Sequence, residues 1–530
     1  MENKKVYREI IKKILTEDFS KDKDLTKVKL WACREFGLKQ FPRNSEILSA
    51  ATDKEKNRLI QLLRIKPIRS ISGVSVITVM PKPFPCPKDE PCIYCPGGPN
   101  RGTPQSYTGK EPAGRRALEN DFDPYKQVKS RIEQFQTIGH NVDKVELIIF
   151  GGTLTAYPQD YLEWFVTQCL NAISGANAKT IKGAQAAAEK STIKNSDITI
   201  ETRPDYCKKS HIDLMLKLGT TRVELGVQTV YNDIYKLVKR EHTVEDVAEA
   251  TRMAKDAGFA VIYHMMTGLP GSNIKRDLKS FETIFQDERF KPDAIKIYPT
   301  LIMPDTKLHS MWEKGEYKPY SLEENIKLIA NIKKQVPRWM RIQRIQRDIP
   351  TNIVSEGVKR GDLRLLVQKQ LREEGAKCHC IRCREVGHVQ YKSELELDSS
   401  NVKLLVDKYK ASDGEELFLS FEDTKNDVLI GLLRLRSPSE KAYRPEAKNT
   451  RSMLVRELHV YGPMVQVGTQ AKGNQWQHRG WGEKLMNEAE RISKEEFDAK
   501  KIIVLAGIGT RNYYKRFGYK HQGPYMIKEI

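Results

Sequence analysis

The sequence predicts an α/β protein: a partial TIM-type barrel, then a second and smaller α/β domain, with a small helical region before both. Two observations predict this arrangement. Six apolar, strand-like runs lie between residues 71 and 365, and amphipathic helical stretches separate them. A new α/β pattern starts near residue 396, with strands expected at residues 417–423, 428–436, 452–462 and 501–507. A chain of 530 residues with 39% hydrophobic and 30% charged residues has material for more than one core.

Residues 1–70 combine helical patterns with many lysines and arginines, and the whole chain has a net charge of +21. Such an excess attracts polyanions and gains affinity by counterion release. A solvated cationic face or a generally basic proteome gives the same composition, so charge alone leaves nucleic acid open. There is no signal-peptide pattern and no apolar stretch long enough to span a bilayer, which predicts a cytoplasmic protein without membrane contact.

The six expected strands are spaced as in alternating strand–helix units, whose ligands bind at the carboxyl ends of the strands. One segment, residues 178–195, interrupts the alternation with small, polar and lysine-rich residues. It is interpreted either as a mobile insertion that acts as a lid or as an ordinary surface helix. The expected strands are residues 73–80, 145–150, 197–202, 222–227, 260–266 and 294–299.

Three cysteines, Cys86, Cys92 and Cys95, crowd into one proline- and glycine-rich loop directly after the first strand. A structural zinc site normally uses four ligands. A cubane cluster held by three cysteines leaves one iron free for a small molecule, and this arrangement suits a [4Fe–4S] cluster that binds S-adenosylmethionine (SAM). The spacing is C-x5-C-x2-C and departs from the usual radical-SAM spacing, C-x3-C-x2-C. A zinc knuckle with a distant fourth ligand stays open.

Polar and glycine residues follow three later strands. Gly151, Gly152 and Thr153 follow the second strand, where glycines allow backbone groups to approach a ligand closely. Glu201, Arg203 and Gln228 lie at the ends of the next two strands, and each of them alone is also compatible with a polar residue at a barrel rim. The predicted SAM-binding residues are Gly151, Gly152, Thr153, Glu201, Arg203 and Gln228.

A second cysteine cluster, Cys378, Cys380 and Cys383, lies in a basic linker that we assign to residues 366–395. Its C-x-C-x2-C density predicts structural zinc with a fourth ligand from a histidine or elsewhere; His379 and His388 are nearby. Unliganded thiols are the alternative. The remaining cysteines, Cys33, Cys169 and Cys207, are expected to be buried apolar residues.

Residues 396–530 contain a loop, QHRGWG, that resembles the coenzyme A loop of GNAT acetyltransferases. It opens a helix, whose free backbone N–H groups and dipole suit a pyrophosphate. An upstream strand would pair with the pantetheine arm of acetyl-CoA, and Tyr514 lies where the fold places the thioester; aromatic packing is the alternative for Tyr513 and Tyr514. The predicted acetyl-CoA residues are Glu457, Leu458, His459, Val460, Gln477, Arg479, Gly480, Trp481, Gly482, Glu483 and Tyr514.

Several longer motifs make the resemblance specific. The runs SYTGKEPAGRRA, ITIETRPDYC, ELGVQTVY, KIYPTL and RIQRDIP resemble the catalytic subunit of Elongator, from about residue 41 to the end. The resemblance implies a single-subunit archaeal or bacterial tRNA carboxymethyluridine synthase with a radical SAM domain over residues 71–365 and a GNAT domain over residues 396–530. It also implies that residues 1–70 bind tRNA, that Lys144 and Tyr514 act on acetyl-CoA, and that the two sites share one cleft.

The implied reaction begins with reductive cleavage of SAM to a 5′-deoxyadenosyl radical, which removes hydrogen from the acetyl methyl group. The carbon radical adds to carbon 5 of the wobble uridine in the anticodon stem-loop, and thioester hydrolysis leaves a carboxymethyl group. An electron donor is required, and accessory subunits or a homodimer stay open. The alternatives are a protein lysine acetyltransferase with an accessory iron–sulfur domain and a tRNA-binding scaffold without turnover.

Overall fold

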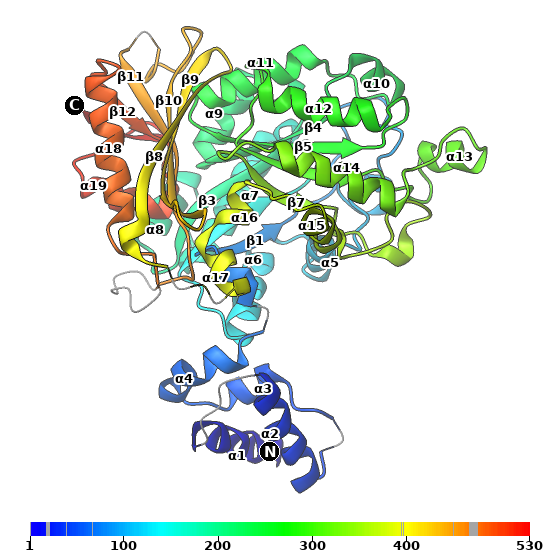
Figure 1. Ribbon diagram of the computed structural model, residues 1–530, viewed down its shortest axis with the longest axis vertical. Coiled ribbons are helices and arrows are strands. Elements are labelled where there is room, and N and C mark those ends of the chain that lie inside the picture. The colour runs from blue at the N-terminus through cyan, green and yellow to red at the C-terminus, as the bar shows by residue number, and fades with distance from the viewer. Residues whose placement is uncertain are drawn as a thin grey trace.

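The computed structural model describes residues 2–16, 22–38, 40–65, 67–393, 395, 397–448, 450–465 and 475–530. Its amino-terminal helices form a small lobe set apart from the two larger domains (Figure 1). Apolar side chains from these helices, among them Ile10, Val28, Leu48 and Leu59, make a core of their own. The helices are α1 (Glu2–Thr16), α2 (Asp22–Glu35), α3 (Asn44–Ser49) and α4 (Asp53–Leu63).

Seven parallel strands follow, hydrogen-bonded in chain order into one sheet with helices outside it. All six predicted strands are present. The seventh, Arg341–Ile345, was missed because its sequence, RIQRI, is too polar to stand out as a buried strand. The strands are β1 (Ser75–Val79), β2 (Lys144–Ile149), β3 (Lys194–Thr202), β4 (Arg222–Gln228), β5 (Ala260–Thr267), β6 (Ala294–Pro299) and β7 (Arg341–Ile345).

Helices on the outer face of this sheet bury its apolar residues. Side chains alternate between the two faces of a strand, so Val223 and Leu225 of β4 join the helices in the main core. The main covering helices are α6 (Pro124–Thr137), α7 (Gln159–Ser174), α9 (Lys209–Leu218), α11 (Val244–Asp256), α12 (Ile274–Gln286) and α14 (Leu322–Gln335), and shorter or peripheral ones are α5 (Pro112–Glu119), α10 (Asn232–Leu237), α13 (Lys307–Glu313) and α15 (Leu363–Glu373).

The segment at residues 178–195 is a packed part of the barrel. It forms α8 (Ile181–Lys190), whose first turn is capped by Thr180, and then leads into β3. Ile181, Ala184 and Ala188 are buried in the main core. The surface-helix interpretation is therefore correct, and the mobile-lid interpretation is wrong because the small residues are a packing face.

The carboxyl-terminal domain is a second seven-stranded sheet, antiparallel except for one parallel pair, β11 with β12. Helix α18 (Trp481–Glu495) packs on it through Leu485 and Ala489. The four predicted strands are present, whereas β8, β13 and β14 were missed. The elements are β8 (Val402–Ala411), β9 (Gly414–Asp423), β10 (Val428–Ser437), β11 (Ser452–Val460), β12 (Lys501–Val504), α19 (Arg511–Lys515), β13 (Lys520–Gln522) and β14 (Tyr525–Glu529), preceded by α16 (Ile381–Arg384) and α17 (Val386–Ser393).

Buried ion pairs join the two sheets. Arg456 of β11 reaches across to Asp293 of the barrel, with Nη1 to Oδ2 and Nη2 to Oδ1 both 2.8 Å. The same guanidinium bonds Glu416 Oε2 at 2.6 Å, and Arg436 joins Glu416 to Asp256. Burial raises the pKa of the Asp293 carboxyl, but Arg456, Lys255 and Arg434 outweigh it and hold that pKa well below its usual range. Removing any one of these charged side chains would therefore leave its partners buried and uncompensated.

No helix within the described residues is long and apolar enough to cross a bilayer.

Removing one member of this network should loosen the whole molecule. Arg456→Met leaves the buried carboxylates of Asp293 and Glu416 undercompensated, so we expect a loss of about 3–5 kcal/mol in the free energy of unfolding. The measurement is the urea denaturation midpoint by circular dichroism. Arg451→Met is the control, because Arg451 and Asp498 pair on the surface with more than 60% of each side chain exposed; it should cost less than about 1 kcal/mol. Equal effects of the two substitutions would contradict the structural role of the network.

Candidate active sites

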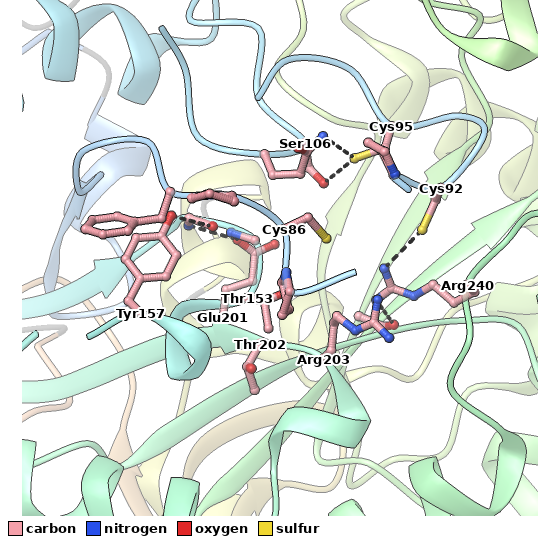
Figure 2. A pocket seen from close by; sticks show the side chains of 18 of the residues that line it. Cys86, Cys92, Cys95, Ser106, Thr153, Tyr157, Glu201, Thr202, Arg203 and Arg240 are labelled. Atoms are coloured by element: carbon pink, nitrogen blue, oxygen red, sulfur yellow. Dashed lines mark hydrogen bonds between the residues drawn. The ribbon is translucent and has the colours of Figure 1, made fainter. Parts of the chain in front are cut away.

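A cavity opens at the carboxyl ends of β1 to β4, and the first three cysteines converge on it (Figure 2). All six residues predicted to bind SAM line it too. The structure therefore brings together what the sequence separates by more than a hundred residues. The lining includes Cys86, Cys92, Cys95, Gly151, Gly152, Thr153, Glu201, Arg203, Gln228 and Arg240.

The three sulfurs have different surroundings. Cys92 Sγ accepts hydrogen bonds from Lys88 Nζ and Arg240 Nη1, each at 3.7 Å. Burial raises the pKa of the Cys92 thiol, yet Arg240 and Lys88 outweigh it and lower that pKa overall. Cys95 Sγ lies 3.0 Å from Ser106 Oγ and 3.3 Å from Gln105 Nε2. Burial raises the pKa of Cys95, and the Cys92 thiolate raises it further.

The spacing of these sulfurs fits a cluster better than a single ion. Within the described residues, the only group whose ligand atoms all lie within 4.8 Å of one another is the second cysteine cluster, Cys378, Cys380 and Cys383. Cys86, Cys92 and Cys95 are more widely separated around one cavity. A cubane cluster occupies more space than one ion, so three separated thiolates beside a cavity fit a [4Fe–4S] cluster with room for a ligand.

The glycine pair after β2 is held against Glu201. Glu201 Oε2 accepts from the backbone N–H groups of Gly151 at 3.3 Å and Gly152 at 3.1 Å, and from the Tyr107 hydroxyl at 2.7 Å. Gly152 has φ +80°, and a Cβ on it would lie 3.0 Å from the Gln105 carbonyl oxygen. Glycine at this position therefore lets the chain turn close to the ligand cavity.

Arg203 and Gln228 complete the cavity wall. Arg203 binds Asp205 through Nε and Nη2, while its buried Nη1 has no hydrogen-bond partner among the described residues. Gln228 has φ +73°, a strained backbone conformation for a non-glycine residue that is common at functional sites. A guanidinium with a spare N–H suits the carboxylate of an amino-acid ligand.

Sequence reasoning missed a buried polar row inside the barrel. His264 Nε2 lies 2.6 Å from Glu224 Oε2, and Lys296 pairs with the same carboxylate. Burial raises the pKa of Glu224, but Lys296 and His264 outweigh it and lower that pKa to about 2. The signal was present in the sequence, since Glu224, His264 and Lys296 each interrupt an otherwise mainly apolar strand, on β4, β5 and β6.

The coenzyme A loop predicted at the start of α18 touches the barrel. Lys144 Nζ, at the amino end of β2, lies 3.1 Å from Gln477 Oε1 and 3.3 Å from His478 Nε2. Gly480 has φ +81° and is the N-cap of α18, followed by Gly482 and Glu483 in its first turn. The Trp481 ring packs against Phe421, with ring centroids 4.9 Å apart. Arg479 lies over the Trp476 ring.

The strand predicted to pair with pantetheine has a free edge. Parallel pairing of β11 with β12 ends at Val455, although β11 continues to Val460. Within the described residues no strand pairs with Glu457, Leu458 or His459 on that side, and the Val460 carbonyl oxygen accepts a hydrogen bond from Gln477 Nε2 at 3.0 Å. The side chains of Glu457 and His459 turn to the barrel instead: Glu457 pairs with Arg222 at 3.1 Å, and His459 Nε2 lies 2.9 Å from the Ser72 carbonyl oxygen.

Tyr514 is buried on α19, with its ring centroid 5.4 Å from that of Tyr513 and 6.1 Å from that of Tyr519. The turn before it is pressed onto β3, because a Cβ on Gly507 would lie 1.8 Å from the Ser196 carbonyl oxygen. Glu189 of α8 binds Lys515 and, through its carbonyl oxygen, Asn512. The barrel thus fixes the position of Tyr514.

The second cysteine cluster brings three sulfurs together without a histidine. His379 Nδ1 lies 3.0 Å from Asp427, and His388 Nε2 lies 2.9 Å from Glu385. Neither histidine lies with the three sulfurs in the described residues, and the source of a fourth ligand stays open. The buried Lys333 ammonium lies 3.6 Å from Cys383 Sγ. Of the isolated cysteines, Cys169 and Cys207 are buried in the core as expected, and Cys33 is partly exposed.

The sequence of this chain is similar to those of known proteins over nearly its whole length. Models of the radical SAM superfamily, the radical SAM C-terminal domain and the ELP3 N-terminal domain match residues 86–284, 292–373 and 3–71. A "tRNA uridine(34) acetyltransferase" of Methanocaldococcus jannaschii is 49% identical, covering 100% of this chain and 99% of that protein. "Elongator complex protein 3" of Saccharomyces cerevisiae is 44% identical over 94% of this chain and 90% of its own length.

The chain belongs to the Elongator complex protein 3 family. A solved structure of the Methanocaldococcus infernus member, lacking residues 1–46, superposes with a TM-score of 0.77 at 46% identity, covering 87% of this chain and 100% of that one. The radical SAM domain implies SAM and a [4Fe–4S] cluster, and the cavity at the carboxyl ends of the strands has the residues to hold both. The predicted family and fold class are confirmed.

The two sets of predicted residues lie at opposite ends of the barrel strands. The cysteine cavity lies at the carboxyl ends of the strands, whereas Lys144 and the α18 loop lie at their amino ends. The strand β2 between them has six residues, a length of roughly 20 Å. The barrel interior with Glu224, His264 and Lys296 separates the sites.

The contact between β3 and the turn before α19 can be tested by adding one methyl group. Gly507→Ala should push residues 508–519 away from β3, at a cost of about 1–3 kcal/mol. Hydrogen–deuterium exchange in that segment should then become roughly 5- to 150-fold faster. Gly361→Ala is the control, because a Cβ there meets nothing within 4 Å. Unchanged exchange in the Gly507 variant would mean that β3 does not hold α19.

Proposed function

We propose that this protein is a tRNA carboxymethyluridine synthase that adds the acetyl carbon of acetyl-CoA to carbon 5 of the wobble uridine. The observation that carries the proposal is the similarity over the full chain to a protein named tRNA uridine(34) acetyltransferase. The proposed domains are a tRNA-binding region (1–70), a radical SAM domain (71–365), a zinc linker (366–395) and a GNAT domain (396–530).

At the carboxyl ends of the strands, Cys86, Cys92 and Cys95 would hold the cluster. When bound, the cluster and SAM supply the one-electron chemistry that activates an unreactive C–H bond. The protein's part is to orient SAM: the Gly151 and Gly152 backbone lines the cavity, and Arg203 Nη1 is available for a carboxylate. Glu201 and Gln228 line the same cavity and would bind the remaining polar groups of SAM.

At the amino ends, the α18 loop would bind the pyrophosphate of acetyl-CoA through free N–H groups at the start of the helix. Gln477, Arg479, Gly480, Gly482 and Glu483 belong to this loop or its first turn. The free edge of β11 would pair with the pantetheine arm. Lys144 would add a cation beside the loop, and Tyr514 would lie at the thioester.

The tRNA would contact the basic surface of the amino-terminal lobe and of the two larger domains. Phosphates bind lysine and arginine with release of counterions, in accord with the net charge of +21. An electron donor must reduce the cluster, and accessory subunits or a second copy of the chain would join through surfaces outside the two sites. Cytoplasmic location follows from this substrate and belongs to the same proposal.

Structural zinc at Cys378, Cys380 and Cys383 is a separate part of the proposal. Three sulfurs within 4.8 Å match the crowding of a single ion, whose bonds to sulfur are about 2.3 Å. The site lies between β7 and the second sheet, since the Ile381 N–H donates to the Met340 carbonyl oxygen and Arg384 Nη1 bonds Glu422 at 2.6 Å. Its role would be to fasten the linker.

The deciding experiment uses anaerobically reconstituted protein with dithionite, SAM, acetyl-CoA and bulk tRNA. Mass spectrometry should find 5′-deoxyadenosine and, in digested tRNA, carboxymethyluridine. Both should disappear in Cys95→Ser, while Tyr514→Phe should lower carboxymethyluridine at least about tenfold by disturbing the acetyl-CoA site. Tyr391→Phe, on the exposed part of α17, is the matched control. Lysine acetylation without 5′-deoxyadenosine would instead establish a protein acetyltransferase, and tRNA binding without either product a scaffold.

Lys144 gives the coenzyme site a pH dependence. Burial lowers the pKa of the Lys144 ammonium to about 8, against the smaller opposing effect of Asp143. Its charge is thus present below pH 8 and lost above it, so the dissociation constant for coenzyme A should rise above pH 8, approaching about tenfold per pH unit. Isothermal titration calorimetry from pH 7 to 9.5 measures this. Lys144→Arg keeps its charge and should remove the rise; a rise that persists in this variant would exclude Lys144 as its source.

A further inference from the structure

The five residues between Cys86 and Cys92 place a buried cation beside the cysteine cavity. Lys88, the second residue of this gap, has only 1% of its side chain exposed. Its ammonium donates to the Lys239 carbonyl oxygen, lies 3.5 Å from Glu241 Oε1 and is 3.7 Å from Cys92 Sγ. Burying a charge is costly unless its hydrogen bonds are satisfied, so these contacts fix the ammonium in one position.

A second cation approaches the same sulfur from another strand connection. Arg240 Nη1 lies 3.7 Å from Cys92 Sγ, and Arg240 Nη2 is anchored on the Gly226 carbonyl oxygen at 2.6 Å (Figure 2). Cys95 Sγ, in contrast, meets the neutral groups of Ser106 and Gln105. Cys92 and Cys95 are therefore electrically unequal, and of the two Cys92 has the positive charges beside it.

Positive charge near an iron–sulfur cluster favours the state with one more electron. Hydrogen bonds to the sulfurs, net charge and solvent exposure together set the reduction potential of such clusters. Coulomb energies are larger inside a protein than in water, and salt screens a buried group less than an exposed one. Glu241 offsets part of the Lys88 charge, but about half of its side chain is exposed to water and its effect is weaker.

We propose that Lys88 raises the reduction potential of the [4Fe–4S] cluster, and that the lengthened gap between Cys86 and Cys92 exists to hold it there. Lys88 is one of the five residues of this gap, which is two residues longer than a C-x3-C gap. Lys88 acts through Cys92 and is a positioning charge; it transfers no group. The proposal rests on the cluster that the radical SAM domain implies and is independent of the RNA substrate.

The test is a redox titration of the reconstituted full-length protein, followed by the electron paramagnetic resonance signal of the reduced cluster, with neither tRNA nor acetyl-CoA present. Lys88→Met should lower the equilibrium constant for reduction at least about tenfold, which is 59 mV for one electron. The matched control is Lys307→Met. Lys307 Nζ lies 2.8 Å from Glu90 in the same gap, but the Lys307 side chain is 55% exposed. Because water screens this charge, the reduction potential of the cluster should be unchanged in the Lys307→Met protein.

Iron and sulfide content and circular dichroism are measured on each variant before titration. Arg240→Gln, which removes the second cation from another part of the chain, should lower the potential in the same direction. An unchanged potential in a fully loaded Lys88→Met protein would overturn the proposal. A Lys88→Met protein that folds but fails to retain the cluster would overturn it as well, because Lys88 would then be needed to build the loop. Loss of carboxymethyluridine formation with a normal potential bears only on the proposed function.

Discussion

The pairing of Arg456 with Asp293 and Glu416 is the constraint on which the arrangement of the two domains depends. Asp293 directly precedes β6, and Glu416 belongs to the second sheet, so one guanidinium fixes the amino ends of the barrel strands against β9 and β11. Arg436 and Arg434 extend the contact to Asp256 and Glu457. Since none of these charges tolerates the loss of its partners, the sheets have one relative position.

That position builds the second site out of both domains. Lys144 reaches the α18 loop, Arg222 holds Glu457 of β11, and β3 with α8 supports the turn before Tyr514. The cysteine cavity, by comparison, is made by the barrel alone. Joining the domains is therefore a condition for the proposed acetyl-CoA site and not for the cysteine cavity.

The sequence predicted the elements that have strong periodicity and the sites that have dense motifs. It did not reveal β7, whose RIQRI run alternates too many polar residues, nor the partners of Cys92, because Arg240 becomes its neighbour only through the fold. Glu457 and His459 were placed on the correct strand, but which of their atoms face a ligand depends on the barrel beside them. The separation of the two sites was also beyond the sequence, since motifs do not say at which end of a strand a distant loop will dock.

The buried ion pairs between the two domains affect how the stability of their interface changes with temperature. The hydration of charged groups becomes less favourable on heating, so the cost of keeping Arg456, Asp293 and Glu416 out of water falls, while the stabilisation from apolar burial levels off. An interface that contains such pairs beside its apolar contacts weakens less on heating than a purely apolar one. The domains would then hold their alignment up to temperatures at which the amino-terminal lobe, with its small apolar core, has begun to open.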